Sequence, residues 1–88
     1  MLNDVKIEAL KRLRYVSGHL SGVVRMVEND TYCVDVRMQT HAIRRAIEKF
    51  EMVLLDGHLR SCVSEGIKKG HEGELIEELV ELYQVSNR

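Results

Sequence analysis

Apolar residues recur every three or four positions along most of this 88-residue chain, and no proline interrupts the pattern. An α-helix has about 3.6 residues per turn, so this spacing places the apolar side chains in one stripe along a helix. The first such segment covers residues 4–28, and Asn3 is positioned to cap its first turn. Its stripe consists of Leu10, Leu13, Val16, Leu20, Val23, Val24 and Val27.

A second and longer segment of the same kind begins near residue 31 and continues to about Ser64, with Gly57 as its one weak point. Three glycines then mark a linker over residues 66–73, and a shorter third helix follows over residues 74–83. The apolar sets are Ala42, Ile43, Ala46, Ile47, Phe50, Val53, Leu54 and Leu59 in the second segment and Leu75, Ile76, Leu79, Leu82 and Tyr83 in the third. The chain is therefore predicted to be all-α, with three helices in each protomer.

Turn-forming and small residues predict where the helices end and where they meet. Asn29-Asp30-Thr31 breaks the apolar pattern, and either Asp30 or Thr31 can cap the second helix. Gly18 and Gly22 lie four positions apart, so they stand one turn above the other on one face of the first helix. We expect another helix to approach closely there, because neither glycine carries a side chain.

Two long helices joined by a short turn form an antiparallel hairpin, which cannot enclose its own apolar stripes. A second copy of the chain would cover them, so we predict a homo-oligomeric helical bundle. A chain of 88 residues is close to the size at which a single core becomes marginal, and residues 1–88 are expected to form one domain.

The composition argues against a membrane or secreted protein. No apolar run approaches the length of a membrane-spanning helix, and the N-terminal residues do not resemble a signal peptide. We therefore expect a cytoplasmic protein with no membrane partner. In the reducing cytoplasm, the two cysteines point to metal or redox chemistry rather than to a structural disulfide.

Charge is unevenly distributed along the chain, although the formal net charge is only −1. Basic residues predominate between Lys11 and Lys49, whereas acidic residues predominate after Cys62. A protein with this asymmetry can present a positive face to nucleic acid, and Arg44 and Arg45 are candidate DNA contacts on this argument alone. Charge by itself favours an ordinary solvated helix surface, so the DNA interpretation needs independent support.

The residues that could bind a metal are Cys33, His58 and Cys62. His58 and Cys62 are four positions apart, so both lie on one face of the second predicted helix. Cys33 precedes His58 by 25 positions, which corresponds to roughly 37 Å along a straight helix. The three side chains cannot meet within one helix, whereas antiparallel pairing of two copies would bring Cys33 of one beside His58 and Cys62 of the other.

Two thiolates and one imidazole form a soft, three-coordinate donor set that suits Cu(I). Zn(II) accepts the same donors but normally takes a fourth ligand. Alternatively, both cysteines are small apolar residues of the core and His58 is a surface histidine, and spacing alone favours this alternative. No nucleophile with a neighbouring base is recognisable, so an enzyme is not expected.

Six short blocks of the sequence stand out: Arg12-Leu13, Gly18-His19-Leu20-Ser21-Gly22, Val24-Arg25-Met26, Tyr32-Cys33-Val34-Asp35-Val36, His58-Leu59-Arg60-Ser61-Cys62 and Ile76-Glu77-Glu78-Leu79. Together these blocks resemble the copper-sensitive operon repressor family in its copper(I)-sensing branch. They occur in register from about Leu10 to Leu82, so the likeness covers nearly the whole chain. The blocks that contain the two cysteines are the most specific, and they favour the metal hypothesis over the alternative of buried cysteines.

The resemblance implies a three-helix protomer, an antiparallel four-helix-bundle dimer and a dimer-of-dimers tetramer. It further implies that the metal-free protein binds operator DNA. The protein is then expected to leave the DNA when each protomer holds one Cu(I), which derepresses copper-resistance or efflux genes. By the same resemblance, Cys33 of one protomer and His58 and Cys62 of its partner hold the metal.

The resemblance also assigns supporting roles. Tyr32 and Glu78 match a pair of residues that hydrogen-bonds the ligating histidine and connects the metal site to the third helix. Arg12 and Lys49 match basic residues that are needed for DNA binding. Relatives often have arginine at position 49, and His41 is a further departure, so the DNA sequence preferred by this chain does not follow from the family.

Three sister branches fit the sequence less well. The nickel- and cobalt-sensing branch has an additional N-terminal histidine and replaces the last cysteine, and the formaldehyde-sensing branch uses an N-terminal proline that this chain lacks. The persulfide-sensing branch keeps both cysteines but lacks the histidine found here as His58, so a thiol or persulfide redox-sensing repressor stays open as an alternative. A copper-buffering protein with no role at DNA is another alternative.

Overall fold

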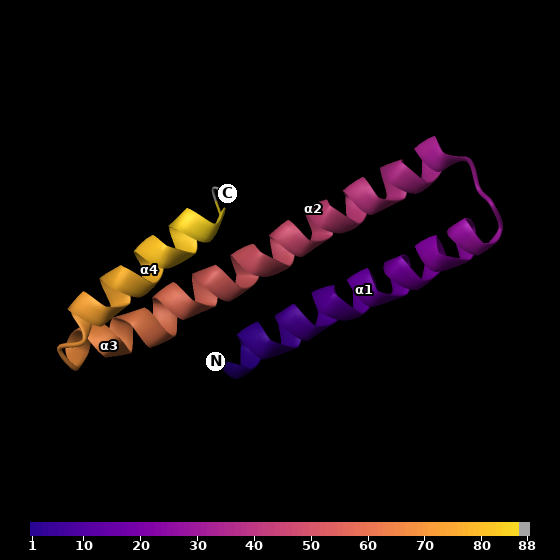
Figure 1. Ribbon diagram of the computed structural model, residues 1–88. Helices are drawn as coiled ribbons and strands as arrows, with labels where there is room; N and C mark the ends of the chain where they lie inside the picture. Colours follow the sequence, from indigo (N-terminus) through magenta and orange to yellow (C-terminus); the bar gives the residue numbers. More distant parts are fainter. Residues whose placement is uncertain (87–88) are drawn as a thin grey trace.

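The computed structural model describes residues 1–86, which are almost entirely helical (Figure 1). The elements are α1 (Asn3–Glu28), α2 (Cys33–His58), a single π-helical turn η1 (Leu59–Val63), α3 (Ser64–Lys68) and α4 (Glu72–Ser86). α2, η1 and α3 follow one another without a break, so they form one long helix over residues 33–68. The described chain thus has three helices and no strand, as the apolar periodicity predicts.

The long helix extends beyond its predicted end near Ser64. It ends only at Lys68, so Gly66 lies inside α3 rather than in a linker. Gly73 likewise lies inside α4, and between α3 and α4 the chain is non-helical only over residues 69–71. The predicted linker is therefore too long, because helices accommodate two of its three glycines at a modest energetic cost.

The end of α1 differs from the predicted capping. Asp30 has a φ of 55°, and the Thr31 amide donates to the Met26 carbonyl at 2.9 Å. The Asp30 amide donates to the Val27 carbonyl at 3.1 Å, which completes a Schellman motif that satisfies the last carbonyls of α1. Asp30 and Thr31 therefore end the first helix rather than cap the second, and Tyr32 precedes α2 without a side-chain cap.

Two further helix ends are set by the backbone rather than by side-chain caps. The predicted cap at Asn3 is wrong, because Asn3 is already helical and Leu2 stands at the cap position without a side-chain hydrogen bond. The turn between α3 and α4 repeats the Schellman geometry. Gly70 has a φ of 80°, and the His71 amide donates to the Gly66 carbonyl at 2.7 Å.

α1 and α2 pack as an antiparallel hairpin around a small apolar core (Figure 1). The buried members of this core are Val16 and Val23 of α1 and Ile43 of α2. The partly buried neighbours are Met26, Val36, Ala46 and Ile47. All three buried residues belong to the predicted apolar stripes, so the periodicity correctly identifies the faces through which the two helices meet.

Helices approach one another closely at Gly57 and Gly66. A Cβ atom at Gly57 would lie 2.8 Å from both methyl carbons of Val5, and one at Gly66 would collide with a leucine side chain of α4. Nothing lies within 4 Å of the corresponding position at Gly18, and only an arginine side chain lies near Gly22. The predicted close approach at Gly18 and Gly22 is therefore wrong within one chain.

The three helices lie side by side in a single layer. α1 and α4 lie on opposite sides of the long helix (Figure 1), and the molecule measures 56 × 30 × 13 Å. The smallest dimension is close to the diameter of one helix with its side chains, about 10–12 Å. Domains normally bury their apolar faces between two layers, and here no other element of the described chain covers either face of the layer.

The accessible surface shows how open this layer is. The chain exposes 7091 Å², whereas a compact monomer of this size exposes about 5,300 Å². Its radius of gyration is 17.3 Å, against about 12 Å for a compact domain of this length. Leu20, Val24 and Val27 of the predicted stripe are half or more exposed. This apolar surface does not amount to a membrane span, since no helix within residues 1–86 has the length and apolarity to cross a bilayer.

Candidate metal centre and nucleic-acid interface

His58 is the last residue of α2, and its ring faces α4. The side chain is 30% exposed, and Nε2 lies 3.4 Å from Oε1 of Glu78 on α4. That distance is within ion-pair range, but the buried Nε2 has no hydrogen-bond partner of acceptable geometry among the described residues. The ring is therefore held by packing, with a carboxylate beside one of its two nitrogens.

This arrangement fits a histidine that binds a metal ion. A ligating histidine coordinates through one ring nitrogen and usually directs the other toward a carboxylate or a carbonyl. Glu78 supplies a carboxylate beside Nε2, which leaves Nδ1 as the nitrogen available for coordination. The same contact links the end of α2 to α4, so the position of the imidazole depends on how these two helices are arranged.

Cys62 lies within η1 and is an exposed free thiol. A π turn contains more residues than a turn of α-helix, so η1 changes the direction of Cys62 relative to His58. Two hydroxyls stabilise this turn, because Ser61 Oγ donates to the Gly57 carbonyl at 2.7 Å and Ser64 Oγ donates to a carbonyl inside the turn at 3.2 Å. Such turns frequently occur at functional sites. The apolar periodicity does not predict η1.

Cys33 and Tyr32 lie at the opposite end of α2 from His58. Cys33 is the exposed first residue of the helix, and Tyr32, which is 68% exposed, immediately precedes it. The 26-residue helix separates Cys33 from His58 by roughly 37 Å. Accordingly, no three His, Cys, Asp or Glu side chains within residues 1–86 form a group that could hold a metal ion. The structure brings Glu78 to His58, but it brings neither Cys33 nor Tyr32 there.

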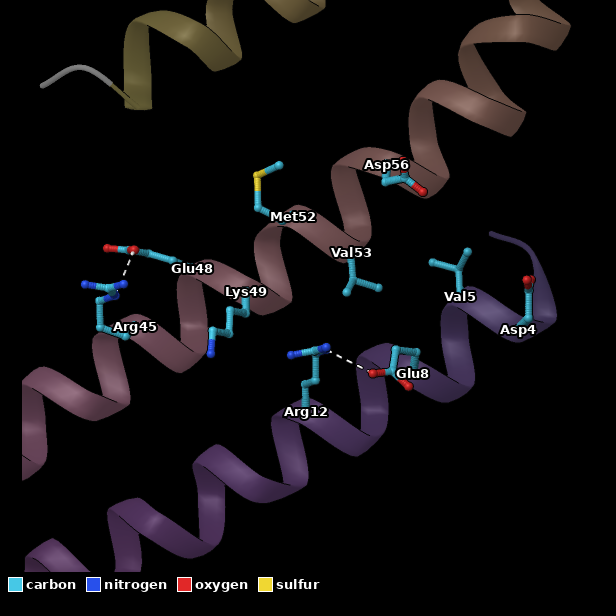
Figure 2. A pocket seen from close by; sticks show the side chains of 10 residues that line it. All are labelled: Asp4, Val5, Glu8, Arg12, Arg45, Glu48, Lys49, Met52, Val53 and Asp56. Carbon is cyan, nitrogen blue, oxygen red and sulfur yellow. Dashed lines mark hydrogen bonds and ion pairs between the residues drawn. The ribbon is translucent and has the colours of Figure 1, made fainter.

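A groove between α1 and α2 collects basic side chains from both helices (Figure 2). Arg12 comes from α1, whereas Arg45 and Lys49 come from α2. Arg12 points toward α2 and donates to Glu8 at 3.0 Å, and Arg45 turns toward Glu48 at 4.0 Å (Figure 2). We refer to this feature as the α1–α2 groove. It unites three of the four basic residues that the sequence identifies as candidate DNA contacts.

The charge of the α1–α2 groove changes along its length. Near the N-terminus of α1, three cations face four carboxylates. These carboxylates are Asp4, Glu8, Glu48 and Asp56. Nearer the turn between the two helices, four cations face one carboxylate, because Lys11 joins the lining and only Glu8 remains. Tyr15 and His41 also line this positive part. Lys11, Tyr15 and His41 are absent from the predicted set, although His41 precedes Arg45 by the four positions that put two residues on one helix face.

Arg44 lies outside the α1–α2 groove, whose lining includes Arg45 but not Arg44. Consecutive residues of a helix point about 100° apart, so the two arginines cannot share one face. Arg44 Nη2 instead lies 3.3 Å from Nδ1 of His41. The structure thus separates two arginines that charge alone places together.

Residues 5–85 match the model of a family described as metal-sensitive transcriptional repressor. This match covers nearly the whole chain, so the protein belongs to the metal-sensitive transcriptional repressor family. The copper-sensing transcriptional repressor CsoR of Mycobacterium tuberculosis (strain ATCC 25618 / H37Rv) is 46% identical over 80 residues, which are 91% of this chain and 67% of the relative. The copper-sensing transcriptional repressor CsoR of Bacillus subtilis (strain 168) is 35% identical over 79 residues, which are 90% of this chain and 78% of the relative.

The fold also matches a solved structure. The copper-sensing repressor CsoR with Cu(I) from Geobacillus thermodenitrificans NG80-2 has a TM-score of 0.93 and 30% sequence identity, and the match covers 100% of this chain and 92% of that chain. The family indicated by the sequence blocks and the all-α, three-helix protomer are therefore confirmed. Transcriptional repressors are not a class of enzymes. The individual roles of the ligand, hydrogen-bonding and DNA-contacting residues stay predictions.

Proposed function

We propose that this protein is a copper(I)-responsive transcriptional repressor. The metal-free protein binds operator DNA and leaves it on holding Cu(I), so that copper-resistance or efflux genes are transcribed. The observation that carries the proposal is the placement of His58, whose Nε2 lies 3.4 Å from Glu78 while Cys62 follows on the adjoining π turn. Relatives of 46% and 35% identity are copper-sensing repressors, which supports copper as the inducer.

Cys33 of one protomer and His58 and Cys62 of its partner would hold the metal, with one Cu(I) per protomer. Both cysteines are exposed free thiols, so each is accessible to an ion shared with a second chain. Two thiolates and one imidazole are soft donors, which favours Cu(I) over ions that prefer oxygen. When bound, the ion supplies a coordinate link between two protomers.

Glu78 and Tyr32 would orient the ligating histidine. A carboxylate at Nε2 favours the tautomer whose proton lies on that nitrogen, so Nδ1 keeps its lone pair for coordination. Tyr32 directly precedes Cys33, and it would enter the partner's site together with that thiol. Glu78 belongs to α4, so a change in the position of the imidazole is passed directly to that helix.

A homo-oligomer would provide the second copy that this site requires. The protomer is a single layer with exposed apolar side chains on α1, and pairing two such hairpins into a four-helix bundle buries them. Each interface of this symmetric kind contains the same pair of contacts twice, which produces two equivalent metal sites per dimer. Two dimers then form the tetramer, and each protomer is a single domain over residues 1–88 that works in the cytoplasm.

The α1–α2 groove would contact the phosphate backbone of operator DNA. Arg12, Arg45 and Lys49 present cations from two helices within one protomer, and Lys11 makes the part of the groove near the turn the most positive. Phosphate contacts of this kind provide most of the affinity and little of the sequence preference. Arg44 stays a candidate on charge alone, at a site outside the groove.

Subunit complementation tests whether two chains build the metal site. The variants Cys33→Ala and Cys62→Ala are unfolded together, refolded and titrated anaerobically with Cu(I), with X-ray absorption at the copper edge identifying the ligands. A mixed dimer contains one site with all three donors, so about one quarter of all sites recover two sulfurs and one nitrogen. Each variant refolded alone is the control. If the mixture binds no more Cu(I) than the separate variants while the wild type binds normally, the shared site is wrong.

A DNA measurement completes the test of the repressor function. A duplex selected from a random-sequence pool by the metal-free wild-type protein serves as the probe. We expect Cu(I) to dissociate the complex and the Cys33→Ala variant to stay bound. A wild-type protein that binds Cu(I) but selects no duplex would be a copper-buffering protein instead.

A thiol or persulfide redox-sensing repressor is the second candidate, because Cys33 and Cys62 are both exposed free thiols. Two thiols brought together across an interface can be joined by an oxidant or a persulfide without any metal. His58→Ala separates the two functions. The copper function predicts that this variant no longer leaves DNA when Cu(I) is added, whereas the redox function predicts a normal response to the oxidant.

A further inference from the structure

One interhelical contact connects the α1–α2 groove to the segment that carries His58 and Cys62. Val5 of α1 lies over Gly57, the residue directly before His58. A Cβ atom at Gly57 would lie 2.8 Å from both methyl carbons of Val5 and 3.3 Å from its Cβ, and the first of these distances is shorter than real carbon atoms allow. Gly57 is buried, so α1 and α2 meet here only because position 57 carries no side chain.

Both sides of this contact continue into residues with a proposed function. Val5 lines the α1–α2 groove together with Arg12, which lies two turns further along the same helix. On the other side, the Gly57 carbonyl accepts a hydrogen bond from Ser61 Oγ at 2.7 Å. Ser61 belongs to η1, the π turn that also contains Cys62. A displacement of the π turn therefore moves Gly57, and Val5 lies so close to Gly57 that no Cβ atom would fit between them.

We propose that the Val5–Gly57 contact is a positioning contact, through which the geometry of the π turn sets the separation of α1 and α2 in the groove. The proposal rests on the proposed function, in which ligands are held near the π turn and DNA lies against the groove. When the π turn changes, the first turns of α1 shift, and Arg12 moves relative to Lys49. Coupling between two sites requires such an element with a different arrangement in each state. Val5 and Gly57 carry neither a metal donor nor a charge, so the contact acts through the side chains that do.

Gly57→Ala tests the contact at the groove. Alanine is favoured over glycine inside a helix, so a loss of function has to come from the collision with Val5 rather than from the helix itself. We expect the metal-free variant to bind the selected duplex about tenfold more weakly than the wild type. Adding Val5→Ala, which removes both methyl groups, is expected to restore the affinity. Gly18→Ala is the matched control, because nothing lies within 4 Å of its Cβ position.

Hydrogen exchange gives a second readout that needs neither DNA nor metal. Ser61→Ala removes the donor to the Gly57 carbonyl, and we expect faster amide exchange over residues 5–12 of α1, on the other side of the contact. Ser86→Ala is the control, since its hydroxyl makes the same kind of bond, to the Leu82 carbonyl at 3.0 Å, on α4 and outside both η1 and α1. In that variant, exchange over residues 5–12 is expected to stay as in the wild type.

The two readouts distinguish a failure of this proposal from a failure of the repressor function. Wild-type affinity in Gly57→Ala, or an affinity that Val5→Ala does not restore, overturns the positioning contact. Unchanged exchange over residues 5–12 in Ser61→Ala overturns it as well. If the wild-type protein binds no duplex, the repressor function fails, while the exchange measurement still decides whether the π turn and α1 are coupled.

Discussion

The α1–α2 groove and the candidate metal ligands differ in the number of chains that they require. Arg12 and Lys49 come from adjacent helices and line one groove within a single protomer. Cys33 and His58 are the first and last residues of the same helix, so they cannot meet without a second copy. Under the proposed function, the surface for DNA is therefore encoded in the protomer, and the metal site is encoded in the assembly.

This difference explains how one small chain can couple two ligands. A metal held between protomers binds one quaternary arrangement better than another and so favours it. Under the proposed function, the DNA surfaces are complete in each protomer, and their spacing across the assembly is what the quaternary arrangement changes. Substitutions in the α1–α2 groove should therefore change DNA binding alone, and substitutions near the candidate metal ligands should change Cu(I) binding alone. The following predictions test this separation.

The largest expected effect follows from removing two cations of the groove. Arg12→Ala combined with Lys49→Ala is expected to lower the affinity for the selected duplex by about 100-fold at low salt and the salt slope by about two. Cu(I) stoichiometry in an anaerobic titration should equal that of the wild type. Lys6→Ala combined with Lys69→Ala is the matched control, because neither lysine lines the groove. If the double variant also loses Cu(I) binding, the α1–α2 groove and the metal site are not independent of each other.

A smaller effect is expected at the contact between His58 and α4. Glu78→Ala removes the carboxylate that lies 3.4 Å from Nε2, and we expect Cu(I) affinity, measured by competition with a chelator, to fall by about 10- to 100-fold. DNA binding by the metal-free variant should not change. Glu77→Ala is the control, since Glu77 does not line the pocket beside His58. Equal losses in both variants would show that the acidic charge of α4 matters rather than the contact.

The smallest expected effect separates two neighbouring arginines. Arg45→Ala should lower the affinity for the duplex a few-fold and the salt slope by about one, because Arg45 lines the groove. Arg44→Ala should have a smaller effect on both quantities, since Arg44 does not line the groove and only approaches it through His41, whose Nδ1 lies 3.3 Å from Arg44 Nη2. Both substitutions remove one positive charge, so only their positions differ. Equal effects would indicate that DNA responds to the total charge of the protomer and not to the groove.

The parts of the fold that repeat along the chain can be predicted from the sequence. Val16, Val23 and Ile43 are buried where the apolar period places them, because a helix fixes which residues share a face. The separation of Cys33 from His58 also follows from helix geometry, and it is enough to predict that one chain cannot assemble the three donors. Such conclusions need only the rise and period of a helix.

The parts that depend on a choice between backbone hydrogen bonds cannot be predicted in this way. In the π turn next to His58, a few amides donate to the carbonyl five residues earlier instead of four. This change leaves the spacing of apolar residues almost unaltered, so the apolar pattern does not predict the turn. Asp30 is predicted as a possible cap of the second helix, but in the structure it ends α1 with a positive φ. The amides of Asp30 and Thr31 donate to the last carbonyls of α1, and the apolar pattern does not reveal this choice of partners. The close approach at Gly57 depends on which side chain of α1 lies opposite, and a local pattern does not contain that information.

The thinness of the protomer has a consequence for the amount of working protein in a cell. A layer whose smallest dimension is 13 Å has little interior of its own, so under the proposed oligomer folding and association become one equilibrium. The free energy of unfolding then includes an association term, and dilution alone shifts chains toward the unfolded state. Unfolded chains are removed by proteases, so a cell that makes too few copies loses them faster than one that makes many. Under the proposed oligomer, the protein is therefore expected to persist only above a minimum concentration.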